Sequence, residues 1–350
     1  MYSPAPVTVA QLAEFDDIID VRSESEFAED HIPGAINCPV LDNEQRARVG
    51  TLYKQVSSFE AKRTGAAMVS RNIARHLDAT LSSYARNWSP LIYCWRGGSR
   101  SGALTHVLQQ VGWRARQLDG GYKAYRRMVT AALEDLPCRF RLNVICGLTG
   151  SGKSRLLRAL AQCGAQVLDL EALAAHRGSV LGNLPGEPQP PQKLFESLIW
   201  SALRRFDSAR PVFIEAESKK VGNLRVPEAL IAAMWSGVCI RLEATMPLRV
   251  AMLREEYRHY VDDPRLLGVQ LDLLTPLYGN NRIEAWKSMA IAGAWDKLVS
   301  ELLEFHYDPA YTRSTLKHYP QYPDGMQLEI ATHTNAAFDQ LAASCLARCG

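Results

Sequence analysis

Residues 147–154, GLTGSGKS, constrain the fold of this chain more than any other stretch. They match the pattern G-x-x-x-x-G-K-[ST] completely, and the flanking stretches NVICGL and SRLLRALAQCG predict a strand that leads into a helix. In such a turn, backbone N–H groups and the helix N-terminus surround a di- or triphosphate, and a lysine adds a positive charge. The sequence therefore predicts an α/β domain with a phosphate site. We assign this site to Gly147, Gly150, Ser151, Gly152, Lys153 and Ser154, with Arg155 nearby, and Ser154 could hold Mg²⁺.

Short apolar runs alternate with helix-compatible stretches along most of the chain. The runs are DIIDVR, PLIYCW and ARQLDGG in the first part, and NVICGL, AQVLDLE, PVFIEAE and SGVCIRLEA in the second. Strands separated by helices are typical of parallel α/β sheets. Because the alternation breaks at Pro137, we predict a first α/β domain over residues 1–136 and a second over residues 137–350. The second domain should have a helical C-terminal part that includes residues 262–305.

Composition places the chain among ordinary globular proteins. Apolar residues make up 47% and charged residues 22% of its 350 residues, and no run of eighteen apolar residues predicts a membrane span. The first residues lack the basic-then-apolar order of a signal peptide, so we expect a cytoplasmic protein with no membrane partner. The net charge of +3 does not by itself indicate a nucleic-acid partner. The eight cysteines lack zinc-ligand spacing, and most of them should be buried.

One cysteine stands in a different setting, at the head of the loop CWRGGSRSG. Cys94 follows the strand candidate PLIY, and a helix that Ser101 can begin follows the loop. Glycines allow the loop to direct its N–H groups at the sulfur, which stabilises a thiolate, and Arg96 and Arg100 add positive charge for an anionic donor. The alternative is a structural cysteine before a turn, but that leaves the clustered glycines and arginines unexplained.

The cysteine loop and its surroundings resemble the rhodanese domain. The resemblance rests on the loop itself, on D-V-R at residues 20–22 with H-I-P-G-A at residues 31–35, and on L-D-G-G-Y at residues 118–122. It covers roughly residues 5 to 130 and implies that Cys94 is the catalytic chalcogen carrier. The resemblance also implies a donor loop made of Arg96, Gly97, Gly98, Ser99 and Arg100.

Acidic residues follow two predicted strands of the second domain. Asp169 ends AQVL, and Glu215 and Glu217 end PVFI, close to Lys219 and Lys220. Such carboxylates either manage magnesium and water at a phosphate site or are ordinary charges at strand ends. The crowding of two acids, a serine and two lysines at one strand end favours a phosphate-handling site.

Taken whole, the chain resembles the bacterial tRNA 2-selenouridine synthase family. Besides the two loops, the resemblance rests on AHRGSVLG at residues 175–182, IEAESKKVG at residues 214–222 and HYDPAYTRS at residues 306–314. One departure is Ala216, where relatives often carry an acidic residue. No residue is therefore assigned as a metal ligand, and the resemblance leaves a requirement for Mg²⁺ open.

The resemblance implies a two-step reaction on tRNA that bears 2-thiouridine at the wobble position. Geranyl diphosphate first alkylates the sulfur, and selenium from selenophosphate then replaces the geranylthiol. No tightly bound cofactor is implied, and the enzyme that produces selenophosphate is a further candidate partner. Residues proposed to complete an anion pocket or to contact tRNA phosphate are Arg177, Ser179, Lys219 and Lys220. For Arg177 the alternative is a surface salt bridge.

Two other functions and the position of an apolar slot stay open at this point. The chain could be a nucleotide-dependent kinase or ATPase fused to a sulfur carrier, or a tRNA-binding sulfur-relay module. A geranyl tail needs an apolar slot, although aromatic residues at helical spacing are more often core. Side chains available for the slot are Phe195, Leu198, Trp200, Met234 and Trp235.

Overall fold

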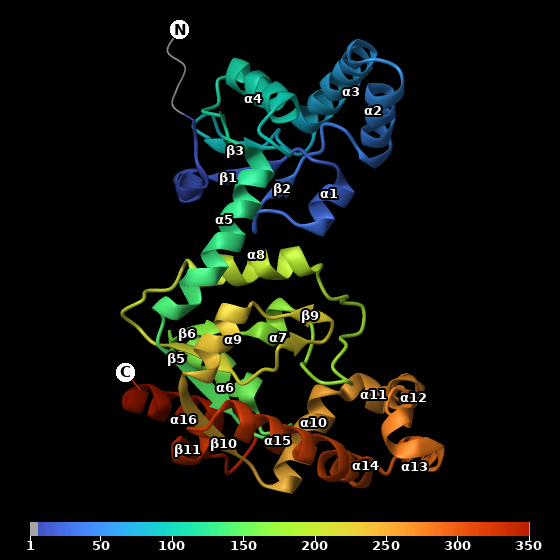
Figure 1. Ribbon diagram of the computed structural model, residues 1–350, viewed down its shortest axis with the longest axis vertical. Coiled ribbons are helices and arrows are strands. Elements are labelled where there is room, and N and C mark those ends of the chain that lie inside the picture. Colours follow the sequence, from blue (N-terminus) through green and yellow to red (C-terminus); the bar gives the residue numbers. More distant parts are fainter. Residues whose placement is uncertain (1–5, 350) are drawn as a thin grey trace. The chain divides into compact units, whose positions relative to one another are not determined.

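The computed structural model describes residues 6–349, which form two compact units (Figure 1). The first unit contains the described residues up to Ala132 together with Pro191–Ser201, and the second contains Leu133–Pro190 and the described residues from Ala202. The predicted domains, 1–136 and 137–350, differ from this division mainly at residues 191–201. Residues 1–5 and 350 of those domains lie outside the described residues.

The first unit is built on a four-stranded parallel sheet. Its strands are β1 (Asp17–Asp20), β2 (Ile36–Asn37), β3 (Pro90–Tyr93) and β4 (Arg116–Gln117), in the order β2-β1-β3-β4. All four residues of β3 are buried, as its uninterrupted apolar sequence predicts. The carboxyl end of β3 delivers Cys94 to the edge of the sheet where ligands bind in open α/β folds.

Helices flank this sheet. They are η1 (Val9–Glu14), α1 (Glu24–Glu29), α2 (Asn43–Gln55), α3 (Ser58–Asp78), α4 (Ser99–Val111), α5 (Gly121–Asp135) and α8 (Gln192–Leu203). Polar side chains begin two of them: Asp42 accepts a hydrogen bond from the Gln45 N–H at the start of α2, and Ser57 does the same for Glu60 in α3.

Helix α8 belongs to the first unit although it follows the phosphate loop in the sequence. The Ser197 hydroxyl donates to Asp30 at 2.7 Å, and the rings of Trp200 and Tyr125 meet edge to face with centroids 5.5 Å apart. Arg126 of α5 is also paired with Glu196 of α8. These contacts explain why residues 191–201 do not group with the second unit.

The second unit contains a five-stranded parallel sheet in the order β11-β10-β5-β7-β6. Its strands are β5 (Leu142–Cys146), β6 (Gln166–Leu168), β7 (Val212–Glu215), β10 (Val238–Glu243) and β11 (Met326–Glu329), and a separate antiparallel pair is formed by β8 (Lys220–Val221) and β9 (Leu224–Arg225). Every residue of the central strand β5 is buried. Helix α6 (Lys153–Gln162) follows β5 and packs with α16 (Asn335–Cys349) in a core that includes Leu156, Leu160 and Phe338.

Other helices of the second unit lie around the sheet and in a C-terminal group. The former are η2 (Leu136–Arg139), α7 (Leu170–Leu173) and α9 (Glu228–Trp235); the latter are α10 (Met246–Glu256), α11 (Arg258–Asp262), α12 (Pro264–Asp272), α13 (Thr275–Ile291), α14 (Trp295–Leu302), η3 (Leu303–Tyr307), α15 (Asp308–His318) and η4 (Tyr322–Asp324). Figure 1 shows α11 to α14 gathered in orange, and their core surrounds the fully buried Trp286. Helix α14, the π-helical turn η3 and α15 run on without a break from Trp295 to His318.

The structure confirms the predicted α/β class, the parallel sheets with flanking helices and the helical C-terminal part. The helix after the cysteine loop begins at Ser99 rather than at Ser101, and the short strands β2, β8, β9 and β11 were not predicted. Among residues 6–349, no helix has the length and apolarity needed to cross a lipid bilayer.

Candidate active sites

The Cys94 sulfur lies where strand β3 ends and the loop to α4 begins. The side chain is 4% exposed. Its Sγ accepts hydrogen bonds from the Gly98 N–H at 3.3 Å and from the Ser101 hydroxyl at 3.1 Å. Burial alone would raise the pKa of Cys94, but the hydrogen bonds from the Ser101 hydroxyl and from the N–H groups of Ser101, Arg96 and Gly98 outweigh burial and lower it. The loop is therefore built to stabilise a thiolate.

The predicted L-D-G-G-Y turn packs against the cysteine loop. The Tyr122 N–H donates to the Cys94 carbonyl at 2.9 Å. Gly97 has a φ of +67°, and a Cβ there would lie 2.7 Å from the Leu118 carbonyl oxygen, so only glycine fits. The cysteine loop and the L-D-G-G-Y turn, both of which carry the resemblance to the rhodanese domain, thus lie in direct contact.

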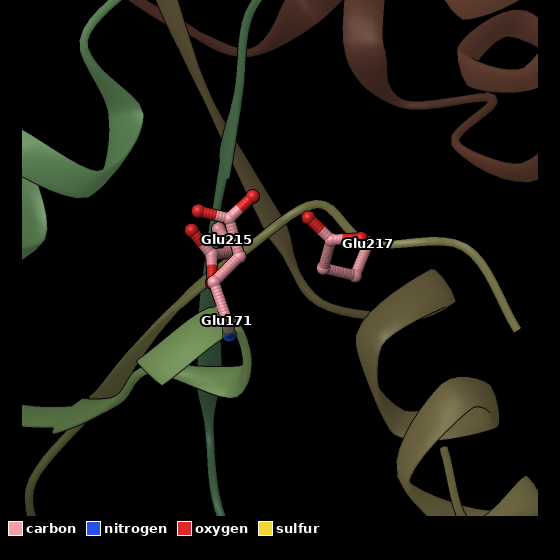
Figure 2. Close-up of side chains that lie close together, drawn as sticks. All are labelled: Glu171, Glu215 and Glu217. Atoms are coloured by element: carbon pink, nitrogen blue, oxygen red, sulfur yellow. The ribbon is translucent and has the colours of Figure 1, made fainter. Parts of the chain in front are cut away.

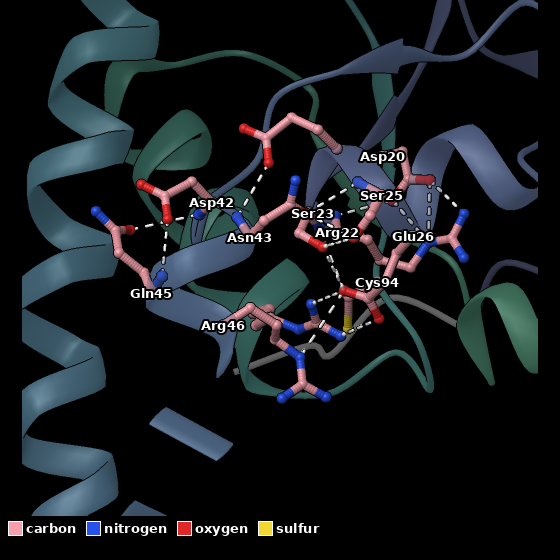
Figure 3. Close-up of polar contacts among 12 residues, drawn as sticks. Asp20, Arg22, Ser23, Ser25, Glu26, Asp42, Asn43, Gln45, Arg46 and Cys94 are labelled. Carbon is pink, nitrogen blue, oxygen red and sulfur yellow. Dashed lines mark hydrogen bonds and ion pairs between the residues drawn. The ribbon is translucent and has the colours of Figure 1, made fainter. Parts of the chain in front are cut away.

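The two loop arginines have different settings. Arg100 donates at 2.7 Å to Glu26, which Figure 3 labels together with Arg46, so the charge of Arg100 is largely compensated, contrary to the prediction that both arginines serve an anionic donor. Burial would raise the pKa of Glu26, but the hydrogen bond and charge of Arg100, with the Ser23 N–H and Arg46, lower it. Arg96 and Ser99 are exposed, so Arg96 is the loop cation that faces solvent.

The D-V-R motif forms a buried ion pair beneath the cysteine loop. Arg22, 1% exposed, donates to Asp20 at 2.6 Å and to the Asp30 carbonyl at 2.6 Å, and its guanidinium lies 4.1 Å from the centre of the Tyr122 ring. Burial would lower the pKa of Arg22, but the hydrogen bond and charge of Asp20 raise it. The Tyr122 hydroxyl donates to the Asp30 carboxylate at 2.8 Å, which ties the motif to the L-D-G-G-Y turn.

In the second unit, the phosphate loop lies between β5 and α6 as predicted. Gly150 and Gly152 have φ of +77° and +84°, and a Cβ on Gly152 would lie 2.6 Å from the Phe338 ring. Lys153 donates to the Gly147 carbonyl at 2.8 Å, and the Gly147 N–H donates to the Tyr311 hydroxyl at 2.7 Å. Ser151 is buried and its hydroxyl has no partner among the described residues.

Three carboxylates gather beside this loop (Figure 2). Glu171, Glu215 and Glu217 each place an oxygen within 4.8 Å of the others. The Ser154 hydroxyl donates to Glu171 at 3.0 Å and lies 3.5 Å from a Glu215 oxygen. Glu171 comes from α7 and was missed by sequence reasoning, whereas Asp169 caps that helix by accepting from the Ala172 N–H at 2.8 Å.

Crowding and burial raise the pKa values of these three carboxyl groups. Burial raises the pKa of Glu171 to about 6, against the opposing effects of Lys153 and the Ser154 hydrogen bond. Burial, together with the charge of Glu171, raises the pKa of Glu217 to about 8. For the fully buried Glu215, burial and the neighbouring carboxylates raise the pKa well above its usual value. The cluster therefore favours a bound cation or bound protons.

A single cavity of about 1400 Å³, including its open mouth, brings the sequence motifs of the second unit together. Its lining includes Lys153 and Ser154 of the phosphate loop, Arg177 and Ser179 of the HRGS stretch, and Glu217 of EAES. It also includes residues that were not assigned from the sequence, namely Glu171, Tyr257, Tyr307, Tyr311 and Tyr319. These five come from elements distant in sequence, and only the HYDPAYTRS resemblance pointed to Tyr307 and Tyr311.

Six predicted site residues of the second unit are not among the lining residues of this cavity: Gly147, Ser151, Arg155, Glu215, Lys219 and Lys220. Arg155 donates to Glu256 and to Glu255, each at 2.9 Å, which corrects its assignment to the diphosphate: it lies in the first turn of α6 but turns toward α10. Lys219 and Lys220 are exposed beside the β8–β9 pair, and Lys219 lies 5.4 Å from the centre of the Trp235 ring. They do not complete the anion pocket.

Arg177 is held at the cavity wall by two weak contacts. Its guanidinium lies over the Tyr257 ring, 5.2 Å from the ring centre, and 4.0 Å from a Glu256 oxygen. The predicted alternative of a surface salt bridge therefore describes only part of its setting, because the same side chain lines the cavity.

Fold and sites together define a chain with a rhodanese-like unit, which carries a stabilised cysteine, and a P-loop α/β unit. Sequence models of known families agree: residues 6–128 match the rhodanese-like domain, and residues 140–270 match the tRNA 2-selenouridine synthase AAA domain. The chain belongs to the tRNA 2-selenouridine synthase family.

Curated relatives named tRNA 2-selenouridine synthase resemble the chain over 69% of its length. The protein of Nitrosomonas europaea is 35% identical over 244 residues, that of Shewanella halifaxensis 34% over 245 residues, and that of Hydrogenovibrio crunogenus 36% over 248 residues. The matched segments cover 63%, 66% and 67% of these relatives, respectively. The chain therefore spans slightly less than two thirds of the first two proteins.

Proposed function

We propose that the chain converts wobble 2-thiouridine of tRNA to 2-selenouridine in two steps in the cytoplasm. The observation that carries this proposal is the shared cavity, in which the phosphate loop, the HRGS stretch, EAES and HYDPAYTRS meet. Family membership supports the tRNA substrate, and the stabilised Cys94 supports a second, separate chemical step.

In the first step, the P-loop unit transfers a geranyl group. The sulfur of 2-thiouridine forms a bond to C1 of geranyl diphosphate, the C1–O bond breaks, and diphosphate leaves with the electron pair of that bond. The base loses its N3 proton to solvent. Lys153 and the N–H groups of residues 150–152 would bind the leaving diphosphate and stabilise its developing charge, without hydrolysis of a nucleotide.

Residues of the acidic cluster fit Mg²⁺, which prefers oxygen ligands. Ser154, Glu171, Glu215 and Glu217 would hold it, and the ion would neutralise charge on the diphosphate. Their raised pKa values agree with a site that is most stable when a cation compensates the carboxylates.

In the second step, selenium replaces the geranylated sulfur. The Cys94 thiolate forms a bond to C2 of the base while geranylthiolate leaves and takes a proton; selenide then bonds to C2 and expels the Cys94 thiolate. Water breaks the P–Se bond of selenophosphate, which yields phosphate and selenide. Selenium and sulfur keep their oxidation levels throughout. A perselenide on Cys94, in contrast, would need a two-electron oxidant to form and a two-electron reductant to release selenide. An enzyme that makes selenophosphate is the partner that this step requires.

The test uses purified protein, tRNA bearing 2-thiouridine and geranyl diphosphate, followed by nucleoside mass spectrometry with and without selenophosphate. The wild type should form the geranylated base alone and the seleno base when selenophosphate is present. Cys94→Ala should accumulate the geranylated base, and Lys153→Ala should form neither product. Absence of any geranyl adduct, together with tRNA-stimulated ATP turnover, would instead support a nucleotide-dependent enzyme.

A further inference from the structure

A second, apolar cleft opens from the phosphate cavity of the second unit. The two cavities share five lining residues: Thr149 of the phosphate loop, Ser179, Leu253, Tyr257 and Tyr307. A ligand whose phosphate lies at Lys153 can therefore extend past Thr149 into the cleft. The cleft has a volume of about 570 Å³, a figure that includes its open mouth.

The inner part of the cleft is lined almost entirely by hydrocarbon and aromatic side chains. It is formed by Leu181, Tyr260, Val261, Leu267, Trp295, Leu298, Val299, Leu302 and Leu303. Arg254 also lines the cleft, but its guanidinium is paired with Asp296 at 2.8 Å. The walls of the cleft therefore present mainly apolar surface to a bound ligand.

The hydroxyl groups of Tyr260 and Tyr257 in the cleft are already engaged by the protein. The Tyr260 hydroxyl donates to the Leu181 carbonyl at 3.1 Å, and the Tyr257 hydroxyl lies 3.4 Å from the Ser179 hydroxyl. A purine base or a ribose would lose its hydrogen bonds to water here without replacement, which is costly. A hydrocarbon chain would lose nothing and would gain from burial.

We propose that this cleft binds the hydrocarbon tail of an isoprenoid diphosphate whose head group lies in the phosphate loop. The side chains that line only the cleft, Trp295 and Leu298 among them, set the length of chain that is accepted. As a statement about transfer to tRNA, the inference rests on the proposed function; as a statement about binding, it stands on the cavity alone. The slot residues considered from the sequence, Phe195, Leu198, Trp200, Met234 and Trp235, do not line this cleft.

The test compares two probes, geranyl diphosphate and inorganic diphosphate, by calorimetric titration. Val261→Phe and Val299→Phe fill the cleft from half-buried positions, and Val269→Phe, at a 66% exposed position of α12, is the matched control. The filling variants should bind geranyl diphosphate about tenfold or more weakly, because at least two methylene groups lose burial. Their affinity for inorganic diphosphate, and the affinities of the control for both probes, should stay unchanged.

A second variant tests chain length. Leu298→Ala enlarges the cleft and should raise the use of farnesyl diphosphate relative to geranyl diphosphate several-fold. Leu271→Ala, a buried change in the same core outside the cleft, should leave the ratio unchanged. Equal ratios in both variants would overturn the assignment of chain-length control.

The outcomes separate this inference from the proposed function. If the wild type transfers geranyl to tRNA but the filling variants bind and transfer it equally well, the cleft is not the tail site and the function stands. If the wild type transfers nothing, the proposed function fails. The cleft would still be established as the tail site if the wild type bound geranyl diphosphate more tightly than inorganic diphosphate and the filling variants lost this difference. Equal binding of both probes by the wild type would overturn the inference.

Discussion

Replacing Ser101 by alanine should raise the pKa of Cys94 by about one to two units. The Ser101 side chain is fully buried, and its hydroxyl donates to the sulfur at 3.1 Å. A hydrogen bond to a charged group contributes about 1.5–3 kcal/mol, and one pKa unit corresponds to about 1.4 kcal/mol. The N–H groups of Ser101, Arg96 and Gly98 remain in the variant, so part of the stabilisation survives.

The assay is the pH dependence of alkylation of Cys94 by iodoacetamide, followed peptide by peptide with mass spectrometry. At a pH well below the pKa, the thiolate fraction and the rate should fall about ten- to hundredfold in Ser101→Ala. The exposed thiols of Cys138 and Cys163 serve as internal references.

Thr105→Val is the matched control, because the Thr105 hydroxyl donates to the Ser101 carbonyl at 2.8 Å rather than to the sulfur. Its alkylation profile should match that of the wild type. An unchanged profile for Cys94 in Ser101→Ala would refute the view that this hydroxyl stabilises the thiolate.

Three further predictions concern stability. Because the pKa of Glu217 is about 8 in the folded chain against an ordinary 4.5, the folded state binds the proton more tightly, and the free energy of unfolding should fall by several kcal/mol as pH rises from 5 to 8.5. Glu217→Gln should make this slope shallower in urea titrations, with the rest of the slope due to Glu171 and Glu215, and parallel slopes would contradict the account. Arg22→Met leaves Asp20 buried without its cation and should cost about 3–5 kcal/mol, whereas Arg63→Met, in an exposed pair, should cost less than about 1 kcal/mol; thermal melts that rank them otherwise would count against it. Trp286→Ala should lower stability by about 3–5 kcal/mol by calorimetry, and a loss below 1 kcal/mol would show that the helical group contributes little to cooperative unfolding.

The parts of the fold that local sequence encodes could be predicted. The phosphate loop was predictable because strand, glycines, lysine and helix follow one another directly between Leu142 and Gln162, and the buried run of β5 agrees with this order. The cysteine loop was predictable for the same reason, since the glycines, Ser101 and the sulfur lie within eight residues.

The parts of the fold that depend on contacts between residues distant in sequence could not be predicted. Helix α8 joins the first unit through Ser197 and Asp30, which lie 167 residues apart in the sequence. Glu171 was not recognised because its role depends on the pairing of β6 with β7, which brings the end of AQVL beside that of PVFI. Arg155 illustrates the converse: its neighbours in sequence bind phosphate, but the Glu255 and Glu256 side chains of α10 determine where it points.

The continuous helical run from Trp295 to His318 relates the two ends of the proposed ligand site. Trp295, Leu298 and Leu302 line the apolar cleft, and Tyr311 and Thr315, further along the same run, line the phosphate cavity. Leu302 and Tyr311 are separated by nine residues, which corresponds to a helical rise of roughly 13 Å. This one helical run thus sets the distance between the apolar cleft and the phosphate cavity, and so between the two ends of an amphiphilic substrate. Natural insertions or deletions of single residues within this run should be poorly tolerated, because each would turn every later side chain by about 100° around the axis.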